Sequence, residues 1–211
     1  MARPIVYGSA MSPYVWSVRL ALAEKGVAHE LVSVGISEMR AETHLTRHPF
    51  GKIPAFEHDG FTLYETQAIM RYVDEAFPAA PLQPIEVQPF ARMNQIMGIV
   101  DNYLTPCLLA DVIFQRMVAP MIGRTTNDET VSAALPKVRH CLGEIARLAD
   151  DQPFLAGDAV TLADLMAIPQ IYYFKKFPDG VAQLAELPAL AAWANRMEAR
   201  QSLQVTRPAG M

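Results

Sequence analysis

Two short strands joined by a tight loop lie in the part of the chain best suited to bind a small peptide. Lys52–His58 and Phe61–Tyr64 are predicted strands, and Asp59-Gly60 between them readily adopts the positive φ angles of a two-residue hairpin loop. Pro54 has no N–H to donate to a sheet, so we expect the chain to turn at Ile53-Pro54, with a cis bond as one way to do so. Ile53 would then offer its backbone N–H and C=O to an extended ligand.

The second strand leads directly into Glu65-Thr66 and then into an apolar helical pattern. We expect Thr66 to be the N-cap of that helix, next to free N–H groups and the positive end of the helix dipole. A site that pairs with an extended backbone and binds a carboxylate suits a small acidic peptide. On these residues alone, a structural hairpin packed on a helix, with Pro54 protecting a sheet edge, is an equal interpretation.

The composition restricts the classes of partner. The chain has 211 residues, 51% of them hydrophobic and 19% charged, with a net charge of −4. This composition is typical of a compact folded protein with a substantial core. No long basic run favours nucleic acid or an anionic membrane, and we found no uninterrupted apolar run of about 18 residues. Cys107 and Cys141 have no metal-binding spacing, so we expect no metal and a cytoplasmic location.

The N-terminal third predicts an α/β domain. Residues 4–8 form a short apolar strand, Ser12-Pro13 begins a helix that ends at Lys25-Gly26, and Glu30–Val34 forms a second strand. A strand, helix and strand of these lengths imply a parallel pair with a right-handed crossover. A less regular helix over Glu38–Thr46 precedes the hairpin, giving the order βαβ-α-ββα.

The rest of the chain predicts helices only. Pro78, Pro81, Pro84 and Pro89 mark a boundary, so we predict domains at residues 1–80 and 90–211 with a linker at 81–89. Apolar positions indicate a helix over residues 96–107, interrupted by Pro106. They indicate further helices over 131–149, after a capping box at Thr161–Asp164, and over 190–197, which together form a helical bundle.

This arrangement resembles that of the cytosolic glutathione transferases. Within the family, the chain resembles a bacterial-type member, similar to the serine-type phi and theta classes. The resemblance covers nearly the whole chain and rests on Ser12-Pro13, residues 18–26 (VRLALAEKG), residues 47–56 (RHPFGKIPAF), Glu65-Thr66 and the capping box. It implies a thioredoxin-like N-terminal domain, an all-helical C-terminal domain, and glutathione as co-substrate.

Ser12 is the candidate catalytic residue. At the start of the first helix, its hydroxyl and nearby N–H groups are suited to stabilise the thiolate of glutathione as a hydrogen-bond donor. Ser9 is the nearby competitor. A structural N-cap role for Ser12 is compatible with the catalytic role.

The resemblance also implies how the co-substrate is held. Glu65 and Thr66 bind the γ-glutamyl end, while Ile53, before Pro54, pairs with the cysteinyl part. Lys52 reaches toward the glycyl carboxylate. Arg40 is a weaker candidate for the same group, because an exposed helix arginine needs no ligand.

A hydrophobic electrophile and a second subunit are the other implied partners. The predicted electrophile pocket is lined by Met11, Tyr14, Tyr103, Ile113, Phe114 and Met117. Methionine and aromatic residues at helical spacing are also common in cores. Phe50, in Pro-Phe-Gly, resembles the aromatic residue that inserts into the partner subunit of family homodimers.

The predicted activity is conjugation of glutathione to an electrophile, with peroxide reduction or dehalogenation as variants. A glutathione-binding or structural homologue without turnover is the alternative. A thiol-disulfide reductase is disfavoured, because no cysteine lies near Ser12.

Overall fold

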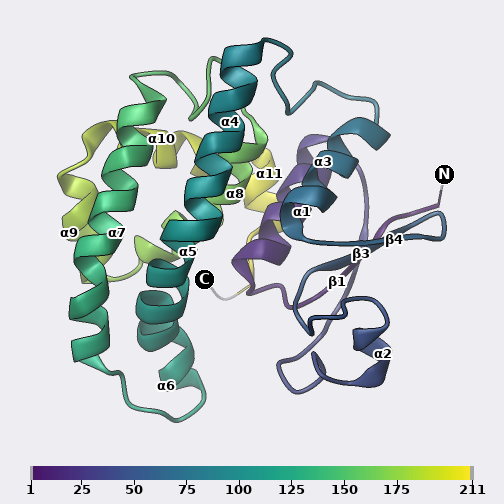
Figure 1. Ribbon diagram of the computed structural model, residues 1–211, viewed down its shortest axis with the longest axis horizontal. Coiled ribbons are helices and arrows are strands. Elements are labelled where there is room, and N and C mark those ends of the chain that lie inside the picture. The colour runs from purple at the N-terminus through teal and green to yellow at the C-terminus, as the bar shows by residue number, and fades with distance from the viewer. Residues whose placement is uncertain (1, 210–211) are drawn as a thin grey trace. The chain divides into compact units, whose positions relative to one another are not determined.

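The computed structural model describes residues 2–209 and divides into two compact units. The sheet unit comprises residues 2–83 together with 199–209, and the helical unit comprises residues 84–198 (Figure 1). The division falls between Gln83 and Pro84, within the proline-rich stretch.

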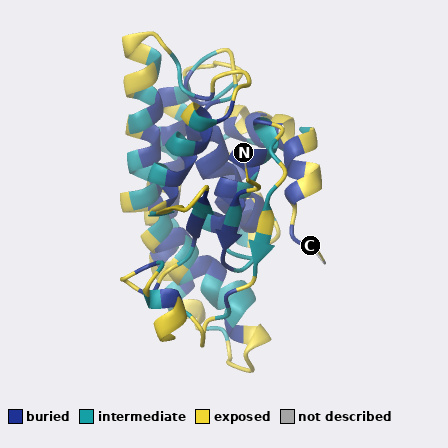
Figure 2. Cartoon of the chain, turned by 90° about the vertical axis from the view of Figure 1, so that its right-hand side faces the viewer, coloured by how far each residue is buried: buried dark blue, intermediate teal, exposed yellow. Residues whose placement is uncertain are grey.

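The sheet unit has the thioredoxin-like βαβ-α-ββα order that the sequence predicts. Its elements are β1 (Ile5–Tyr7), α1 (Pro13–Glu24), β2 (Glu30–Val32), α2 (Glu42–Leu45), β3 (Ala55–His58), β4 (Phe61–Tyr64), α3 (Thr66–Ala76) and the late helix α11 (Gln201–Thr206). The strand order is β2-β1-β3-β4, with β1 parallel to β2 and with β3 antiparallel to both β1 and β4. The two inner strands, β1 and β3, are mostly buried, whereas the edge strands β2 and β4 consist of half-buried and exposed residues (Figure 2).

Local rules explain where α1 begins and ends. Ser12 is its N-cap and Pro13 its first residue, while Gly26 just beyond it has a φ of 67°. Proline at the first position has no unpaired N–H, and glycine tolerates positive φ without a steric cost. The predicted inner face is fully buried at Val15 and Val18.

The hairpin loop also follows the prediction, whereas the strand before it is shorter. Asp59 and Gly60 have φ angles of 50° and 79°. The Ile53–Pro54 bond is cis, and β3 begins only at Ala55. The predicted start of this strand at Lys52 is therefore wrong, because Pro54 cannot donate to the ladder.

The helix predicted over Glu38–Thr46 is reduced to α2, which has four residues. Glu38 does not start it, because a carboxylate oxygen of Glu38 accepts a hydrogen bond from the N–H of Gly35 at 2.6 Å. This local contact stabilises a turn in place of the helix.

The C-terminal segment belongs to the sheet unit, which differs from the predicted helical domain ending at residue 211. The indole N–H of Trp16 donates to Thr206 Oγ1 at 2.9 Å. The guanidinium of Arg200 donates to both carboxylate oxygens of Glu24, at 2.8 and 2.7 Å. These contacts hold α11 against α1, and they join residues too distant in sequence for local patterns to indicate.

The helical unit is built around α8 (Leu162–Phe174), all 13 residues of which are buried. The other helices are α4 (Val87–Ile99), α5 (Thr105–Cys107), α6 (Ala119–Met121), α7 (Asp128–Ala149), α9 (Pro178–Ala185) and α10 (Pro188–Glu198), with the π-helical segments η1 (Val100–Leu104) and η2 (Leu108–Val118). Helix α8 packs against α4, η2, α9 and α10. The predicted all-helical architecture is confirmed.

Pro106 does not interrupt its helix, contrary to the prediction. The helical course continues from Val87 to Met121, and wider π-helical turns lie on both sides of Pro106. These turns accommodate a residue that lacks the N–H of a regular turn. By length and composition alone this helix could also cross a membrane, although no long apolar run was found in the sequence. Its buried residues, such as Met93 and Leu104, belong to the core of the helical unit.

Candidate functional site

The register of the sheet brings the predicted binding segments of the sheet unit to one edge. Tyr7, at the end of β1, pairs with Ala55 at the start of β3, and Ala55 pairs with Tyr64 at the end of β4. The residues that follow β1, precede β3 and follow β4 therefore emerge side by side. These residues are Ser9–Ser12, Lys52–Pro54 and Glu65-Thr66.

Ser12 lies in the turn between β1 and α1. Its Oγ accepts a hydrogen bond from the N–H of Val15 at 3.4 Å, and its carbonyl accepts one from Trp16 at 2.9 Å. The side chain is half-buried. A hydroxyl that accepts through a lone pair retains its own proton for donation, so Ser12 can cap the helix and donate to an anion.

Two other early hydroxyls are engaged differently. Ser9 Oγ accepts from the N–H of Met11 at 3.3 Å. The hydroxyl of Tyr7 donates to Glu57 at 3.0 Å, and burial together with this carboxylate raises the pKa of Tyr7. Because its proton is bound to Glu57, Tyr7 is a poor donor for a ligand.

Ile53 packs against the turn that carries Ser12. A Cβ added at Gly8 would lie 2.5 Å from Val15 Cγ2 and 3.2 Å from Ile53 Cβ. Only glycine fits there, because the two segments approach so closely. The carbonyl of Lys52 is within 2.7 Å of His44 Nε2, a hydrogen bond that holds the segment before the cis Ile53–Pro54 bond.

Arg40 and Lys52 lie close to each other in the chain's fold. A Cβ at Gly51 would lie 3.4 Å from Arg40 Cδ and 3.0 Å from the carbonyl oxygen of Met39. The stem of Arg40 thus runs beside the residue that precedes Lys52, and both cationic side chains are exposed. Together they can attract a carboxylate.

Glu65, and not Thr66, is the N-cap of α3, so the prediction for Thr66 is wrong by one position. Thr66 is the first helical residue and is 7% exposed. Glu65 has φ 71° and ψ 115°, and its side chain makes no capping hydrogen bond. The chain must turn from β4 into α3 at this single residue. Such a conformation costs about 1–3 kcal/mol in a non-glycine residue and is often found at binding sites.

His48 belongs to this region but was assigned no role from the sequence. Its ring is buried and lies 4.9 Å from the ring of Tyr64. Burial lowers the pKa of His48, the Glu65 carboxylate opposes this, and the charges of His44 and Lys52 lower it further. A neutral imidazole therefore lies near both Glu65 and Lys52. The only sequence signal for His48 was its position within residues 47–56, a segment that carries the family resemblance.

Phe50 is a large apolar side chain on the surface of the sheet unit. It is 65% exposed and makes edge contacts with the rings of His48 and Tyr64, at 6.3 and 6.1 Å between centroids. These contacts orient the ring without covering it.

The six predicted electrophile-pocket residues are divided between the units. Met11 and Tyr14 are half-buried in the sheet unit, and Phe114 and Met117 are half-buried in the helical unit. Ile113 is fully buried, so its side chain is part of the core and its assignment to the pocket is corrected. The pocket expected to combine the two groups stays a prediction.

Tyr103 and both cysteines line a cavity of about 770 Å³ within the helical unit. Tyr103 is 66% exposed, whereas Cys107 and Cys141 are buried. Burial, and then the neighbouring Cys141, raise the pKa of Cys107 to about 11, and burial raises the pKa of Cys141. Such thiols are neutral and unreactive at neutral pH, which further disfavours a cysteine-based reductase. Within residues 2–209, no group of three or more potential metal-binding side chains was found.

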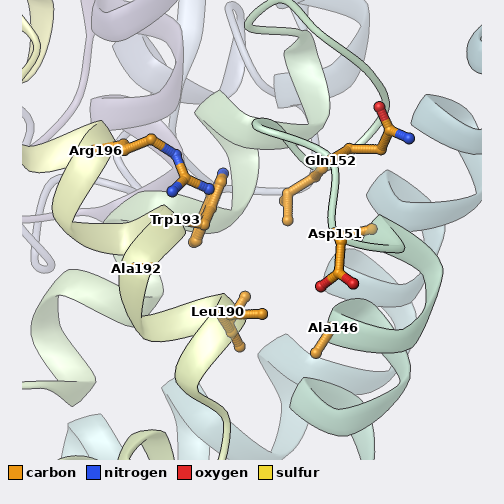
Figure 3. A pocket seen from close by; sticks show the side chains of 10 residues that line it. Ala146, Asp151, Gln152, Leu190, Ala192, Trp193 and Arg196 are labelled. Carbon is orange, nitrogen blue, oxygen red and sulfur yellow. The ribbon is translucent and has the colours of Figure 1, made fainter.

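A smaller cavity, of about 180 Å³, lies between the end of α7, the following loop and α10 (Figure 3). Trp193 and Arg196 project from α10 opposite Ala146 and Asp151. The indole of Trp193 donates to Asp164 and Arg196 Nε donates to the carbonyl of Pro153, so both are structural. None of the predicted site residues lines this cavity.

Comparisons with known families cover most of the chain. Residues 6–81 match the family model of the glutathione S-transferase N-terminal domain, and residues 109–201 match that of the C-terminal domain. Glutathione S-transferase 4 of Zea mays is 34% identical over 205 residues, which cover 95% of this chain and 91% of the relative. A glutathione S-transferase of Hyoscyamus muticus is 30% identical over 209 residues, with 93% and 98% covered.

Solved structures have the same fold. Glutathione transferase F7 from Populus trichocarpa is 28% identical, with a TM-score of 0.87, and the match covers 96% of this chain and 97% of that one. Glutathione S-transferase I from maize, in complex with an atrazine glutathione conjugate, is 27% identical with a TM-score of 0.87. The match covers 98% of this chain and 97% of the maize chain.

Proposed function

Because the chain belongs to the glutathione S-transferase family, we propose that it conjugates glutathione to a hydrophobic electrophile and that Ser12 stabilises the reacting thiolate. The observation that carries this proposal is the convergence of Ser12, Ile53 and Thr66 at one edge of the sheet. Each of these residues supplies a different kind of contact, and together they match the parts of one tripeptide.

The γ-glutamyl end of glutathione binds at the start of α3. Its carboxylate accepts from the N–H and hydroxyl of Thr66, where the helix dipole favours an anion. The carboxylate of Glu65 binds the ammonium group. The φ of 71° at Glu65 supports this assignment, because it fixes the backbone that presents both residues.

The rest of the tripeptide extends from there toward Ser12. The backbone of Ile53 pairs with the cysteinyl part, and the cations of Lys52 and Arg40 attract the glycyl carboxylate. The close approach of Ile53 to Gly8 and Val15 supports this direction, because a cysteinyl residue bound at Ile53 extends its sulfur toward the turn of Ser12.

The chemistry requires glutathione's sulfur to be ionised. A thiol has a pKa of about 8.5, and lowering it by two units requires about 2.7 kcal/mol. One hydrogen bond from a hydroxyl to an anion contributes about 1.5–3 kcal/mol. The thiolate then attacks the electrophilic carbon, a C–S bond forms, and the leaving group departs with its electron pair.

The maize enzyme in complex with an atrazine glutathione conjugate supports an aromatic electrophile for the present chain. Peroxide reduction and dehalogenation use the same thiolate and are variants of the proposal. A panel of aromatic halides, epoxides, hydroperoxides and haloalkanes, assayed with glutathione, distinguishes them by initial rate.

The decisive test is the ionisation of bound glutathione. Thiolate absorbance titrated against pH should show a pKa well below 8.5 in the unmutated protein and a higher one in Ser12→Ala. Ser9→Ala is the matched control and should titrate like the unmutated protein. An unchanged thiol pKa in Ser12→Ala would remove Ser12 from the mechanism. Bound glutathione without any thiolate at neutral pH would favour a binding protein without turnover.

We also propose a homodimer in which Phe50 inserts into the helical unit of the second copy. The exposure of this ring supports the proposal, because a large apolar side chain on a surface loop is costly unless covered. In a two-fold symmetric dimer the Phe50 contact occurs two times, once from each copy.

Phe50→Ala should weaken the dimer by roughly 3–5 kcal/mol per emptied pocket, as measured by native mass spectrometry over a dilution series. Phe61→Ala is the matched control, because Phe61 is also aromatic and is 50% exposed on the hairpin. A monomeric unmutated protein would contradict the role of Phe50.

We propose the cytoplasm as the location. The apolar residues of the 87–121 helix that face inward, such as Ile96 and Leu108, are already covered by the helical unit. Recovery of the protein in the membrane fraction after cell lysis would contradict this.

A further inference from the structure

The cavity of about 180 Å³ at the end of α7 has an apolar lining that belongs partly to the core of the helical unit. Leu155, Leu190 and Trp193 line it and are 1%, 2% and 2% exposed. The other apolar lining residues are all alanines, at positions 146 and 149 on α7 and at positions 189 and 192 on α10. Because alanine ends at a methyl group, the two helices leave a space that larger side chains would fill.

Hydrogen bonds hold this lining in place. Asp164 Oδ1 accepts from the N–H of Leu155 at 2.9 Å and from the indole N–H of Trp193 at 2.7 Å. Arg196 Nε donates to the carbonyl of Pro153 at 3.1 Å, which ties α10 to the loop after α7. The loop and α10 are therefore fixed relative to each other, so a ligand does not have to order them in order to bind.

Asp151 adds a negative charge to this apolar lining. The chain leaves α7 through two consecutive residues in the left-handed region, Asp150 with φ 46° and Asp151 with φ 55°. The carboxylate of Asp151 points toward the space between Leu190 and Ala146 (Figure 3). Within residues 2–209, no hydrogen bond or ion pair engages this carboxylate. A carboxylate directed into an apolar space suits a cation that carries an apolar group.

An anionic ligand fits this cavity less well than a cation. Arg196 projects from α10 beside Trp193, whereas Asp151 projects from the loop (Figure 3). The Nε of Arg196 is already bound to a backbone carbonyl, and the carboxylate of Asp151 repels an anion in the space that it faces. The net charge of the whole chain, −4, also favours a cation.

The volume of the cavity limits the size of the ligand. An engineered apolar cavity of about 150 Å³ binds benzene, which has six carbon atoms. A space of about 180 Å³ therefore accommodates an aliphatic chain of about five carbons together with one polar head group.

We propose that this cavity binds a small primary alkylammonium ion, with the ammonium group on the carboxylate of Asp151 and the alkyl chain against Leu190 and Trp193. An ammonium group donates three hydrogen bonds, which the carboxylate oxygens and water accept. The cavity lies within the helical unit and shares no residue with the proposed glutathione contacts. The inference is therefore independent of the proposed transferase function.

NMR spectroscopy of the ¹⁵N-labelled protein tests the site, with n-pentylammonium chloride as the probe at neutral pH. The chain has two tryptophans, so its spectrum contains two indole N–H signals. The signal of Trp193 should shift in a saturable manner. The signal of Trp16, whose indole donates to Thr206 in the sheet unit, should stay in place. Saturating S-hexylglutathione should leave the titration of Trp193 unchanged, and loss of that titration would overturn the proposal.

Uncharged and anionic analogues separate recognition of the ammonium group from apolar binding. n-Pentanol and n-pentanoate have the same number of carbons as the probe and should each bind about tenfold more weakly, or worse. Shorter ammonium ions should bind about fourfold more weakly for each CH₂ that is removed. Equal binding of n-pentanol, or tighter binding of n-pentanoate, overturns the proposal.

Asp151→Asn and Asp150→Asn form a matched pair of variants. Both remove one exposed carboxylate from the same turn, and asparagine tolerates the left-handed region. Of the two residues, Asp151 lines the cavity, so Asp151→Asn should weaken binding of n-pentylammonium by about tenfold and Asp150→Asn should bind it normally. Equal binding by Asp151→Asn and the unmutated protein overturns the proposal.

Ala192→Leu tests the space itself. Ala192 is an exposed residue of the lining, so a larger side chain there should enter the cavity while the melting temperature changes little. Binding of n-pentylammonium should be lost. Undiminished binding by the folded Ala192→Leu protein would place the ligand elsewhere and overturn the proposal.

Discussion

The helix starts at α8 and α1 differ in how far their polar side chains are engaged by hydrogen bonds within the protein. At α8, Asp164 is completely buried and accepts four hydrogen bonds, from the N–H and hydroxyl of Thr161, the N–H of Leu155 and the indole of Trp193. Every donor that meets this carboxylate belongs to the protein. This start is closed, and it stabilises the fold.

The starts of α1 and α3 are open by comparison. Ser12 is half-buried and its Oγ accepts a long hydrogen bond of 3.4 Å from Val15, and Glu65 makes no capping bond with its side chain. Both are at the edge of the sheet where the loops converge. A helix start closed by its own side chains contributes stability, whereas an open one leaves donors for a ligand.

The largest expected effect is on stability, at the closed start. Asp164→Ala leaves several buried donors without an acceptor, so the free energy of unfolding should fall by about 3–5 kcal/mol. The melting temperature should fall by on the order of 10 °C. Asp164→Asn retains one acceptor oxygen, so its free energy of unfolding should lie between those of Asp164→Ala and the unmutated protein. An Asp164→Ala protein that melts normally would contradict the comparison.

The second largest expected effect is on the rate of conjugation and concerns Ser12, at the start of α1. Ser12→Ala should slow conjugation near neutral pH by roughly 30- to 150-fold, equivalent to about 2–3 kcal/mol. The difference should narrow at high pH, where hydroxide ionises the thiol without help. Loss of the cap should lower stability by only about 1 kcal/mol. A loss of stability without any loss of rate would make Ser12 a structural cap.

Thr66→Ala tests the first residue of α3. Because Glu65 is the N-cap, this variant loses no cap, so its melting temperature should change little. The affinity for glutathione should fall by about tenfold, the effect of one hydrogen bond to a charged group. Thermal shift and calorimetry measure the two quantities. A large drop in melting temperature with normal binding would show that Thr66 stabilises α3 and does not contact the ligand.

The smallest effect concerns the backbone at Glu65. Glu65→Gly removes a side chain from a residue with φ 71°, so stability should rise by about 1 kcal/mol while glutathione binding weakens. Asp59→Gly is the matched control, since Asp59 has φ 50° in the hairpin loop, away from the proposed contacts. Asp59→Gly also removes the carboxylate that accepts a hydrogen bond from the N–H of Ala2 at 2.9 Å, so its stability should change less, and it should bind glutathione normally. Normal glutathione binding by Glu65→Gly would mean that the carboxylate of Glu65 does not contact the ligand.

Several elements were predictable because their causes are local. Ser12-Pro13 and Gly26 set the ends of α1, Asp59-Gly60 set the hairpin, and Thr161 with Asp164 set the start of α8. Each depends on hydrogen bonds or φ angles within a few residues. The errors also have local origins: Glu38 stabilises a turn, and Thr66 looks like a cap because its side chain type is common there.

The sequence by itself therefore determined the order of the elements of the sheet unit up to α3, the starts of α1 and α8, and the resemblance of residues 47–56 to a glutathione site. Only the tertiary structure decided what meets at each site. Sheet register places Ser12, Ile53 and Thr66 at one edge, and the packing of α7 against α10 brings Asp151 to the same cavity as Trp193 and Arg196. Capping and turn geometry act over a few residues, whereas strand pairing and helix packing join residues up to 190 positions apart.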